Sequence, residues 1–436
     1  MPSRRTLLRL CIGLVLVSQL AFLGLSFARA TADYNERYAD TIDAESDVDW
    51  ANVTVVTAQQ IADTGTGGQL FAVTDDGETV YYDDRFATYW DVDPVPGTRA
   101  TVVAVTTEHP AACHDCRRNV VERVNLSTGE RTRLHSHRAE EGRWHDVDLI
   151  GTNELLVADF DDDAVARVNA SSGIRTWSWQ VESAFPLESG GSYDGDWAHL
   201  NDVELLPDGR VMASLRNHDR VVFLNESGVM PSWTLGAEND RNVLYEQHNP
   251  DYIPASRGGP AVLVADSEND RIVEYQRRDG EWVQSWEFTD PAVAWPRDAD
   301  RLPNGHTLIT SSTGDRVFEI NTDGEIVQSL TVDLPYEAER LGTPPESGGG
   351  EAAAALELPS SQTTAESAES GHADALASVV PSRIRNGLLF VRPPWMGVAE
   401  TAASVGTIGL LVAWAILEWR WRDLTVSVTW PIRIRR

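Results

Sequence analysis

A pattern of strands and turns recurs along the middle of the chain, and it restricts the possible folds more than any other feature. Each copy has an opening motif, an apolar strand-like run, a charged turn and a β-rich run that starts at an aspartate. In the four clearest copies these aspartates are Asp163, Asp219, Asp270 and Asp315, which lie 45 to 56 residues apart. Repeats of this length are typical of four-stranded β-propeller blades. The sequence therefore predicts a ring of such blades.

Two weaker copies precede these four. They consist of residues 69–75 with 80–83, and of residues 101–107 with 119–125. Six copies then occupy about residues 50–335. Glycine-containing turns such as Asp208-Gly209 fit hairpins between antiparallel strands. We expect an all-β, six-bladed β-propeller, because closing the ring hides the sheet edges that an open array would expose.

An uncharged apolar stretch lies near each end of the chain. Residues 1–30 contain the first, behind three arginines, and form either a signal segment or a transmembrane anchor; both alternatives stay open. Residues 398–419 are expected to form a transmembrane helix, and residues 420–436 a basic cytoplasmic tail. Both arginine clusters favour the cytoplasmic side, so the propeller is expected outside the cell, held at the cell membrane.

The composition restricts the partners. The formal charge is −31, from 67 acidic and 36 basic residues. Acidity spread along the whole chain favours a halophilic archaeon as the source, since excess surface carboxylate keeps proteins soluble in brine. It argues against nucleic-acid binding, which needs a basic face. Residues 342–380, rich in Gly, Ala, Ser, Glu and Pro, are expected to form a disordered acidic linker.

The opening motifs contain the candidate site residues. They are Trp144-His145-Asp146, Trp197-Ala198-His199-Leu200-Asn201-Asp202, Gln247-His248-Asn249-Pro250-Asp251 and Trp295-Pro296-Arg297-Asp298. Because the first strand of every blade runs along the axis, His145, His199, His248 and Arg297 are expected to meet there, with Arg216 at a strand end nearby. Imidazole and guanidinium groups together favour an anion site. For any one of these residues, hydrogen bonding to a neighbouring turn is the alternative role.

The motifs resemble those of the nucleotide-independent arylsulfate sulfotransferase family over about residues 65–330. The residues that carry the resemblance are His199, Asn201, Ser214 and Arg216 (His-x-Asn, then Ser-x-Arg), His145, Asp146 and Asp148 (His-Asp-x-Asp), and Gln247 with His248. The family is a six-bladed propeller. Two features depart from the family's bacterial enzymes: too few residues precede the first blade for their N-terminal β-sandwich, and this chain has apolar segments that would tether it.

The resemblance implies a function and a set of roles. Sulfuryl transfer from an aryl sulfate to a phenol would proceed by a ping-pong mechanism through a sulfated His248, without a metal or cofactor. Arg216, His145 and His199 would hold the sulfuryl oxygens, and one of the two histidines would protonate the leaving phenolate. Substrate binding is expected of Arg297, Asn201, Trp197 and Trp295, although packing between blades is the alternative for each tryptophan.

A Cys-x-x-Cys pair lies in the insertion of the second blade. Outside the cell, Cys113 and Cys116 are expected to form a disulfide; a zinc site that includes His109 and His114, or free thiols, are the alternatives. Asp161-Asp162-Asp163 lacks the spaced oxygen ligands of a calcium loop and favours a solvated turn.

Other functions of a propeller remain to be compared. Val264–Ile272 resembles a blade of the NHL type, so the main alternative is a non-catalytic extracellular propeller that binds a partner. A quinone-dependent dehydrogenase would show regular tryptophan motifs in every blade. A metal-dependent lactonase needs Glu, Asn and Asp at the channel, where this chain offers His and Arg.

Overall fold

The computed structural model describes residues 3–39, 48–59, 67–109, 117–139, 143–193, 195–344, 348–360, 381–393, 395–421, 425–427 and 433–435. The chain divides into two compact units. One comprises residues 40–369, and the other combines residues 1–39 with residues 370–436.

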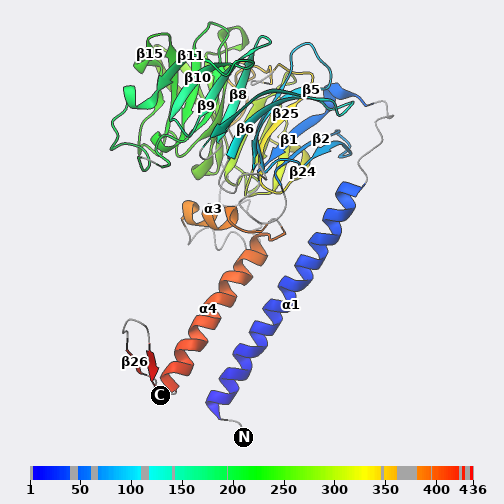
Figure 1. Ribbon diagram of the computed structural model, residues 1–436, viewed down its shortest axis with the longest axis vertical. Coiled ribbons are helices and arrows are strands. Elements are labelled where there is room, and N and C mark those ends of the chain that lie inside the picture. Colours follow the sequence, from blue (N-terminus) through cyan, green and yellow to red (C-terminus); the bar gives the residue numbers. More distant parts are fainter. Residues whose placement is uncertain are drawn as a thin grey trace. The chain divides into compact units, whose positions relative to one another are not determined.

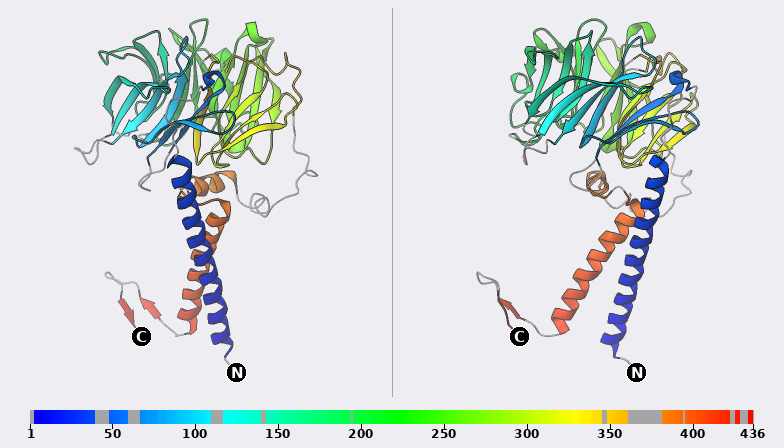
Figure 2. Two further views of the ribbon diagram at one scale, coloured as in Figure 1. Left: turned by 90° about the vertical axis from the view of Figure 1, so that its right-hand side faces the viewer. Right: turned by 45° about the vertical axis from the view of Figure 1, so that its right-hand side comes forward.

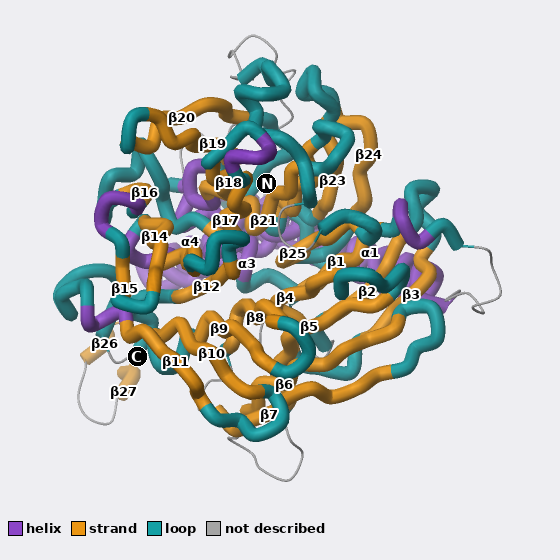
Figure 3. The backbone as a smooth tube through the Cα atoms, turned by 90° about the horizontal axis from the view of Figure 1, so that it is seen from above, coloured by secondary structure: helices purple, strands orange, loops and turns teal. Residues whose placement is uncertain are grey.

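The larger unit is a six-bladed β-propeller, as predicted (Figures 1 and 3). From the axis outwards, the first three blades are β25 (Pro335–Arg340), β1 (Thr54–Ala58), β2 (Gln69–Val73) and β3 (Thr79–Asp83); β4 (Thr88–Pro94), β5 (Thr101–Glu108), β6 (Arg117–Asn125) and β7 (Arg131–Ala139); and β8 (Trp144–Ile150), β9 (Glu154–Asp159), β10 (Ala164–Asn169) and β11 (Arg175–Gln180). The other three are β12 (Leu200–Leu205), β13 (Val211–Leu215), β14 (Arg220–Asn225) and β15 (Gly228–Val229), with β16 (Leu235–Gly236) also on β14; β17 (His248–Ile253), β18 (Ala261–Asp266), β19 (Arg271–Arg278) and β20 (Glu281–Phe288); and β21 (Pro296–Arg301), β22 (Thr307–Ser311), β23 (Arg316–Ile320) and β24 (Ile326–Thr331). Six 3-10 turns join them: η1 (Trp50–Asn52), η2 (Val181–Ser183), η3 (Arg216–His218), η4 (Pro231–Trp233), η5 (Ala255–Arg257) and η6 (Ser267–Asn269).

The ring closes within the first blade. The last propeller strand, β25, is its innermost strand and pairs antiparallel with β1, so that Arg340 lies opposite Thr54. The predicted end of the repeats at residue 335 therefore omits a whole inner strand. The signal was present, since Tyr336-Glu337-Ala338-Glu339-Arg340 repeats the pattern of Arg297-Asp298-Ala299-Asp300-Arg301.

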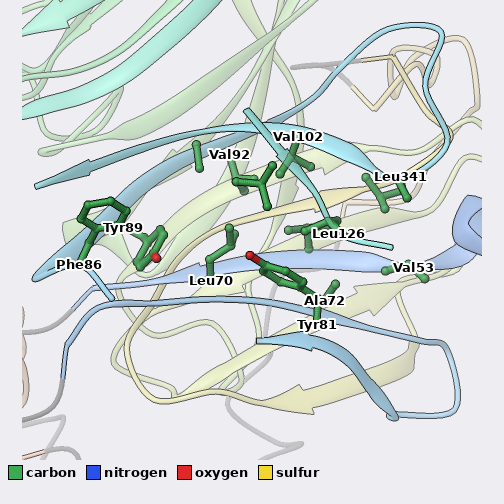
Figure 4. Close-up of a cluster of buried hydrophobic side chains, with 14 of the residues drawn as sticks. Val53, Leu70, Ala72, Tyr81, Phe86, Tyr89, Val92, Val102, Leu126 and Leu341 are labelled. Atoms are coloured by element: carbon green, nitrogen blue, oxygen red, sulfur yellow. The ribbon is translucent and has the colours of Figure 1, made fainter. Parts of the chain in front are cut away.

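The blades pack face to face through apolar strands. Figure 4 shows one such cluster, where Val53 and Leu70 of the first blade meet Tyr89, Val92 and Val102 of the second. All five are at most 1 % exposed. Burying a side chain of this size stabilises a fold by about 1.5–3 kcal/mol. Because a blade is covered on both faces, its central strands are apolar throughout instead of alternating.

The four aspartates that define the repeat occupy one turn, between the second and third strands of each blade. Asp163, Asp219, Asp270 and Asp315 all have left-handed backbones, with φ between 45° and 52°. Each carboxylate accepts a backbone N–H just before the next blade's inner strand; Asp163, for example, binds the N–H of Ala198 at 3.0 Å. Aspartate tolerates this conformation better than most residues. The recurrent aspartate therefore fixes the start of four inner strands, whereas the N–H of Trp144 binds Asn119 Oδ1 at 3.2 Å.

A β-bulge interrupts the ladder between each inner strand and the second strand of its blade. The register shifts leave one unpaired residue in five of the inner strands: Trp90, His145, Asn201, Arg297 and Tyr336. In β17 two residues, Asn249 and Pro250, lie opposite the single residue Val264, so this bulge also adds one residue. A bulge bends the strand and redirects the side chain of the extra residue. Most of these side chains take part in the site described below.

Carboxyl groups follow the bulges and join neighbouring blades. Asp91 accepts the backbone N–H of Val147 at 3.1 Å, and Glu337 accepts that of Val92 at 3.1 Å. Equivalent bonds join Asp146 to Val203, Glu204 to Tyr252 and Asp298 to Ala338. Five of the six inner strands are therefore tied to the next one by a buried acidic side chain.

These carboxyls predict that stability falls as the pH rises. Burial raises the pKa of Asp146 to about 8 and that of Asp298 to about 7, from 3.8. The folded chain therefore holds protons that the unfolded chain has already lost, and this stabilisation disappears as the pH rises through the folded values. One unit of pKa difference corresponds to about 1.4 kcal/mol. Calorimetry at constant salt should show the melting temperature falling from pH 7 to pH 8.5.

The Asp146→Asn variant should reduce this slope, because its amide does not titrate. Asp208→Asn is the matched control, since Asp208 is exposed and its pKa is lowered by the Arg210 side chain. The window lies above pH 7 because the buried histidines, whose pKa values burial lowers, oppose the trend at lower pH. A melting temperature that stays constant or rises from pH 7 to pH 8.5 would contradict this assignment.

Part of the predicted linker belongs to the propeller. Ala352 donates its N–H to Arg257 O at 2.8 Å, and Ala353 donates to both carboxylate oxygens of Glu274 at 3.0 Å. Both alanines are at most 1 % exposed. Small side chains let the segment 348–360 lie against the blades, and Glu274 gains the donors that a buried carboxylate requires. The prediction of disorder is thus wrong for this segment; residues 361–380 lie outside the described part of the chain.

The smaller unit contains the two apolar segments. It comprises α1 (Arg4–Ala39), α3 (Ser382–Phe390), α4 (Val398–Trp421) and a short hairpin of β26 (Thr425–Ser427) and β27 (Arg433–Arg435) (Figure 2). Residues Arg4–Arg29 and Ala399–Trp421 are long and apolar enough to cross a membrane. Both are candidate membrane anchors, in keeping with the sequence.

Candidate functional site

Three histidines from successive blades meet at the axis. The ring centroids of His145 and His199 are 5.1 Å apart, and those of His199 and His248 are 6.3 Å apart. Tyr336, on the inner strand of the first blade, lies 6.3–6.4 Å from His145 and His248. Trp90, on the second blade's inner strand, lies 4.6 Å from His145. Five blades therefore contribute to this ring cluster. Four of the rings lie on inner strands, and His199 lies directly before the inner strand of its blade.

The histidines converge without being equivalent in the repeat. His145 is the extra residue of a bulge, whereas His199 directly precedes β12 with a left-handed φ of 51°. His248 is the first residue of β17, before the two-residue bulge. The expectation of equivalent positions was therefore inexact. Bulges at different points of the inner strands and the left-handed residue His199 bring different positions of the repeat to the same place.

The position and tautomer of His248 are fixed by two acceptors. Its Nδ1 lies 3.1 Å from Glu246 O and 2.9 Å from Ser267 Oγ. Ser267 donates its own proton to Pro296 O at 2.6 Å, so its oxygen accepts from the imidazole. Nδ1 therefore carries the hydrogen, and Nε2 carries the lone pair. Among the described residues, this buried Nε2 has no hydrogen-bond partner.

Residues of the fourth blade hold the backbone before His248. Asn201 Nδ2 donates to Gln247 O at 2.9 Å, and the Gln247 amide donates to Ser214 Oγ at 3.1 Å. Asn201, Ser214 and Gln247 are all fully buried. Three residues of the family motif thus act on the position of His248. The structure gives Asn201 this positioning contact, where the sequence predicted a contact with substrate.

His199 and Arg216 form a polar group beside the ring cluster. His199 Nδ1 lies 2.7 Å from Asp196 Oδ1, and Arg216 pairs with Glu246. One Arg216 nitrogen also lies 3.3 Å from His199 Nδ1. Burial and then the Arg216 charge lower the pKa of His199 to about 4, although Asp196 opposes this. His199 is therefore neutral at pH 7 when no anion is bound.

Arg297 brings a buried positive charge to the cluster. Its guanidinium carbon lies 3.7 Å from the centroid of Trp295 and 5.8 Å from that of Tyr336. The residue is 5 % exposed, and within the described part of the chain its Nε has no hydrogen-bond partner. Burial lowers the pKa of Arg297 to about 9. A buried cation without a carboxylate partner is costly, and a bound anion would offset that cost.

Several contacts were not predicted from the sequence. Asp196 and Glu246 orient His199 and Arg216, and Ser267 sets the tautomer of His248. Tyr336 was missed because the repeats were ended one strand too early. Ser267 could have been found from the repeat. A serine follows the second strand in the last blade too, where Ser312 donates to Pro335 O as Ser267 donates to Pro296 O.

The two predicted substrate-binding tryptophans are largely enclosed. Trp197 is 1 % exposed, donates to Ser189 O at 2.6 Å and packs against His218. Trp295 is 5 % exposed, and its indole N–H donates to Glu268 at 3.0 Å. This placement favours packing between blades for Trp197. Trp295 instead lies against the guanidinium of Arg297.

Two further predictions concern cysteines and metals. Cys113 and Cys116 lie outside the described residues. Within the described ranges, no three His, Cys, Asp or Glu side chains are arranged to hold a metal ion. The cluster at the axis combines the buried, unpaired imidazole Nε2 of His248 with the guanidinium groups of Arg297 and Arg216, an arrangement suited to binding an anion.

Comparisons with known proteins assign no family to the chain. No family model matches the sequence, and no curated protein matches it. Among solved structures, a putative 6-phosphogluconolactonase from Bacteroides uniformis is 13 % identical (TM-score 0.43; 66 % of this chain and 98 % of that chain covered). A virginiamycin B lyase from Staphylococcus aureus is 10 % identical (0.40; 64 % and 85 %), and a periplasmic gluconolactonase from Pseudomonas aeruginosa is 14 % identical (0.44; 66 % and 99 %). These likenesses concern the fold alone.

Proposed function

We propose that the protein transfers a sulfuryl group from an aryl sulfate to a phenol through a covalent intermediate on His248. The main support is the buried Nε2 of His248, which has no hydrogen-bond partner among the described residues, in a cluster with the guanidinium of Arg297, which is buried and forms no ion pair with a described residue. An aryl sulfate supplies what each group lacks: a negative charge for the arginine and an electrophilic sulfur for the imidazole. The resemblance to the arylsulfate sulfotransferases adds to this support.

In the first half-reaction, the Nε2 lone pair of His248 attacks sulfur. The N–S bond forms as the bond between sulfur and the aryl oxygen breaks, and the phenolate leaves with the bonding electrons. The positive charge that develops on the imidazole is stabilised by Glu246 O and Ser267 Oγ, which accept from Nδ1–H. Arg297 and Arg216 bind the sulfuryl oxygens.

We assign the proton of the leaving phenolate to His199. The sulfate charge opposes the effects that lower the pKa of His199, and Asp196 stabilises its protonated ring. His199 takes up a proton from solvent when the anionic donor binds, and donates it to the phenolate as the first product forms. In the second half-reaction the acceptor phenol returns a proton to His199, and its oxygen takes the sulfuryl group from His248. Charge and protons balance over the two steps.

The decisive experiment measures whether release of 4-nitrophenol from 4-nitrophenyl sulfate depends on a second phenol. The full-length protein, purified in detergent at high salt, is assayed with and without the acceptor, and the sulfated acceptor is identified by mass spectrometry. We expect acceptor-dependent release with equal amounts of both products. Release without a sulfated acceptor would indicate a sulfatase. No reaction of the folded protein with several acceptors would favour the non-catalytic propeller.

The acid role of His199 predicts the effect of Asp196→Asn. The neutral amide cannot stabilise the protonated ring, so kcat should fall by about 10- to 100-fold, a part of the about 10²–10⁴-fold that a general acid contributes, with a smaller change in KM. Donors with poorer phenolate leaving groups should lose more than 4-nitrophenyl sulfate, because they depend more on the proton. An equal loss for all donors would indicate that Asp196 acts only on the local structure.

A further inference from the structure

The two apolar helices of the smaller unit pack along matching faces. In α1 the less exposed residues recur at intervals of three and four: Arg9, Ile12, Leu16, Gln19, Leu23 and Ser26. In α4 the same spacing links Glu400, Ala403, Thr407, Leu410, Trp414 and Leu417. Alternating intervals of three and four form one continuous face of a helix and are typical of two helices packed lengthwise. The face of each helix is therefore covered by the other.

Three polar pairs connect these faces in antiparallel order. Near one end Arg9 Nη2 donates to Glu418 at 2.9 Å, and near the other Ser26 donates to Glu400 at 2.8 Å. Between them, the Thr407 hydroxyl donates to Gln19 Oε1 at 3.0 Å. From one pair to the next, the number of residues along α1 nearly equals the number of residues in the opposite direction along α4. One register thus pairs polar groups at both ends and in the middle.

Local sterics fit this register. A Cβ on Gly406 would lie 3.2 Å from the Gln19 amide nitrogen, so the glycine leaves room for that side chain. Small residues commonly allow such close approach between membrane helices. In lipid, polar side chains without partners are costly. Gln19 and Thr407 therefore stabilise each other in the apolar stretches. Glu400 and Glu418 each gain a partner from α1, in addition to the Gly397 N–H and the Trp414 indole N–H that they bind near or within α4.

We infer that α1 is retained in the mature protein as the partner of α4, and that it is not removed as an export signal. A leader that is cleaved after translocation needs only length, hydrophobicity and a cleavage site. It has no need of polar groups in register with a helix close to 400 residues later in the chain. Cleavage after residue 28 or 30 would leave Thr407, Glu400 and Glu418 without these partners. Retention would place both arginine clusters on one side of the membrane.

The first test determines the N-terminus of the full-length protein extracted from membranes. Peptide mass spectrometry should recover peptides from residues 10–29, and the intact mass should include α1. An N-terminus at or near residues 29–31 in most molecules would overturn the inference. This result does not depend on whether the protein transfers sulfuryl groups.

The second test probes the register by cross-linking in membranes. In a Cys11→Ser background, Gln19→Cys with Thr407→Cys should form a disulfide on mild oxidation, seen as a joined pair of peptides after proteolysis. The control pair is Gln19→Cys with Ile408→Cys, because Ile408 is 63 % exposed on a different face of α4. We expect several-fold more cross-link for the first pair. Equal yields, or cross-links only between two copies of the chain, would overturn the pairing of α1 with its own α4.

Discussion

Substitution of His248 by alanine is expected to abolish acceptor-dependent release of 4-nitrophenol, with a loss of at least about a thousandfold in kcat/KM. His248 provides the only imidazole at the axis whose tautomer the structure fixes with a buried, unpaired Nε2 among the described residues. Without it neither half-reaction has a covalent acceptor. The assay is the initial rate with saturating phenol, and wild-type protein exposed to ³⁵S-labelled donor should carry acid-labile label that the variant lacks.

The matched control for this substitution is His218→Ala. His218 is as deeply buried as His248, but it packs against Trp197 and Phe185 and bonds Ser189 Oγ, away from the ring cluster. It should lower the melting temperature and leave the rate of the folded protein within severalfold of wild type. If His248→Ala retains transfer while the labelled intermediate still forms, another residue carries the sulfuryl group and the proposed mechanism fails.

Substitution of Arg297 by methionine should raise stability and reduce activity at the same time. The guanidinium is buried and forms no ion pair with a described residue, so a methionine of similar length removes the cost of burying that charge. Replacing buried ion pairs by apolar residues can gain about 1–4 kcal/mol, and we expect a gain of this order. The same change removes a cation from the developing charge of the transition state, where one preorganised contact contributes about 10²–10³ in rate. Denaturant unfolding and kcat/KM, measured on one preparation, should therefore change in opposite directions.

Arg301→Met gives the contrasting result. Arg301 is also fully buried but pairs with Glu274 at 3.3 Å, away from the histidines. Removing it leaves a buried carboxylate, and breaking a buried pair costs about 3–5 kcal/mol. This variant should lose stability. If Arg297→Met is destabilised like Arg301→Met, the Arg297 charge is already compensated in the free protein, and the argument for an anion site fails.

The sequence predicted the ring of blades because four aspartates at one turn are fixed by backbone geometry. Their left-handed conformation and the bond to the next blade restrict the residue type wherever that turn recurs. Tyr336 was missed because its strand begins after the last recognisable aspartate turn, at Asp315. Its motif also has no histidine. The repeat is therefore detectable in the sequence where each blade requires an aspartate at the same left-handed turn.

The arrangement within the site was less accessible to sequence. His145, His199 and His248 meet although they are not equivalent, and the bulges that bring them together depend on the pairing of whole strands. The contacts of Asp196, Glu246 and Ser267 likewise arise from turns that adjoin only in the folded ring. The compact segment 348–360 was misjudged from its composition, because small residues suit both an unstructured linker and a close-packed surface.

Closure of the ring through β1 and β25 determines how the propeller responds to a force that pulls on its two ends. Thr54 begins β1 opposite Arg340, which ends β25, so the two chain ends leave the ladder side by side. Once the segment 348–360 has been detached from the blades, pulling these two ends apart would break the backbone hydrogen bonds of the ladder one after another and not all at once. Tyr336 lies near the far end of that ladder, among the last residues to be released. A tether that holds the two ends of this ladder together would therefore keep Tyr336 in the ring cluster during the first stages of forced unfolding.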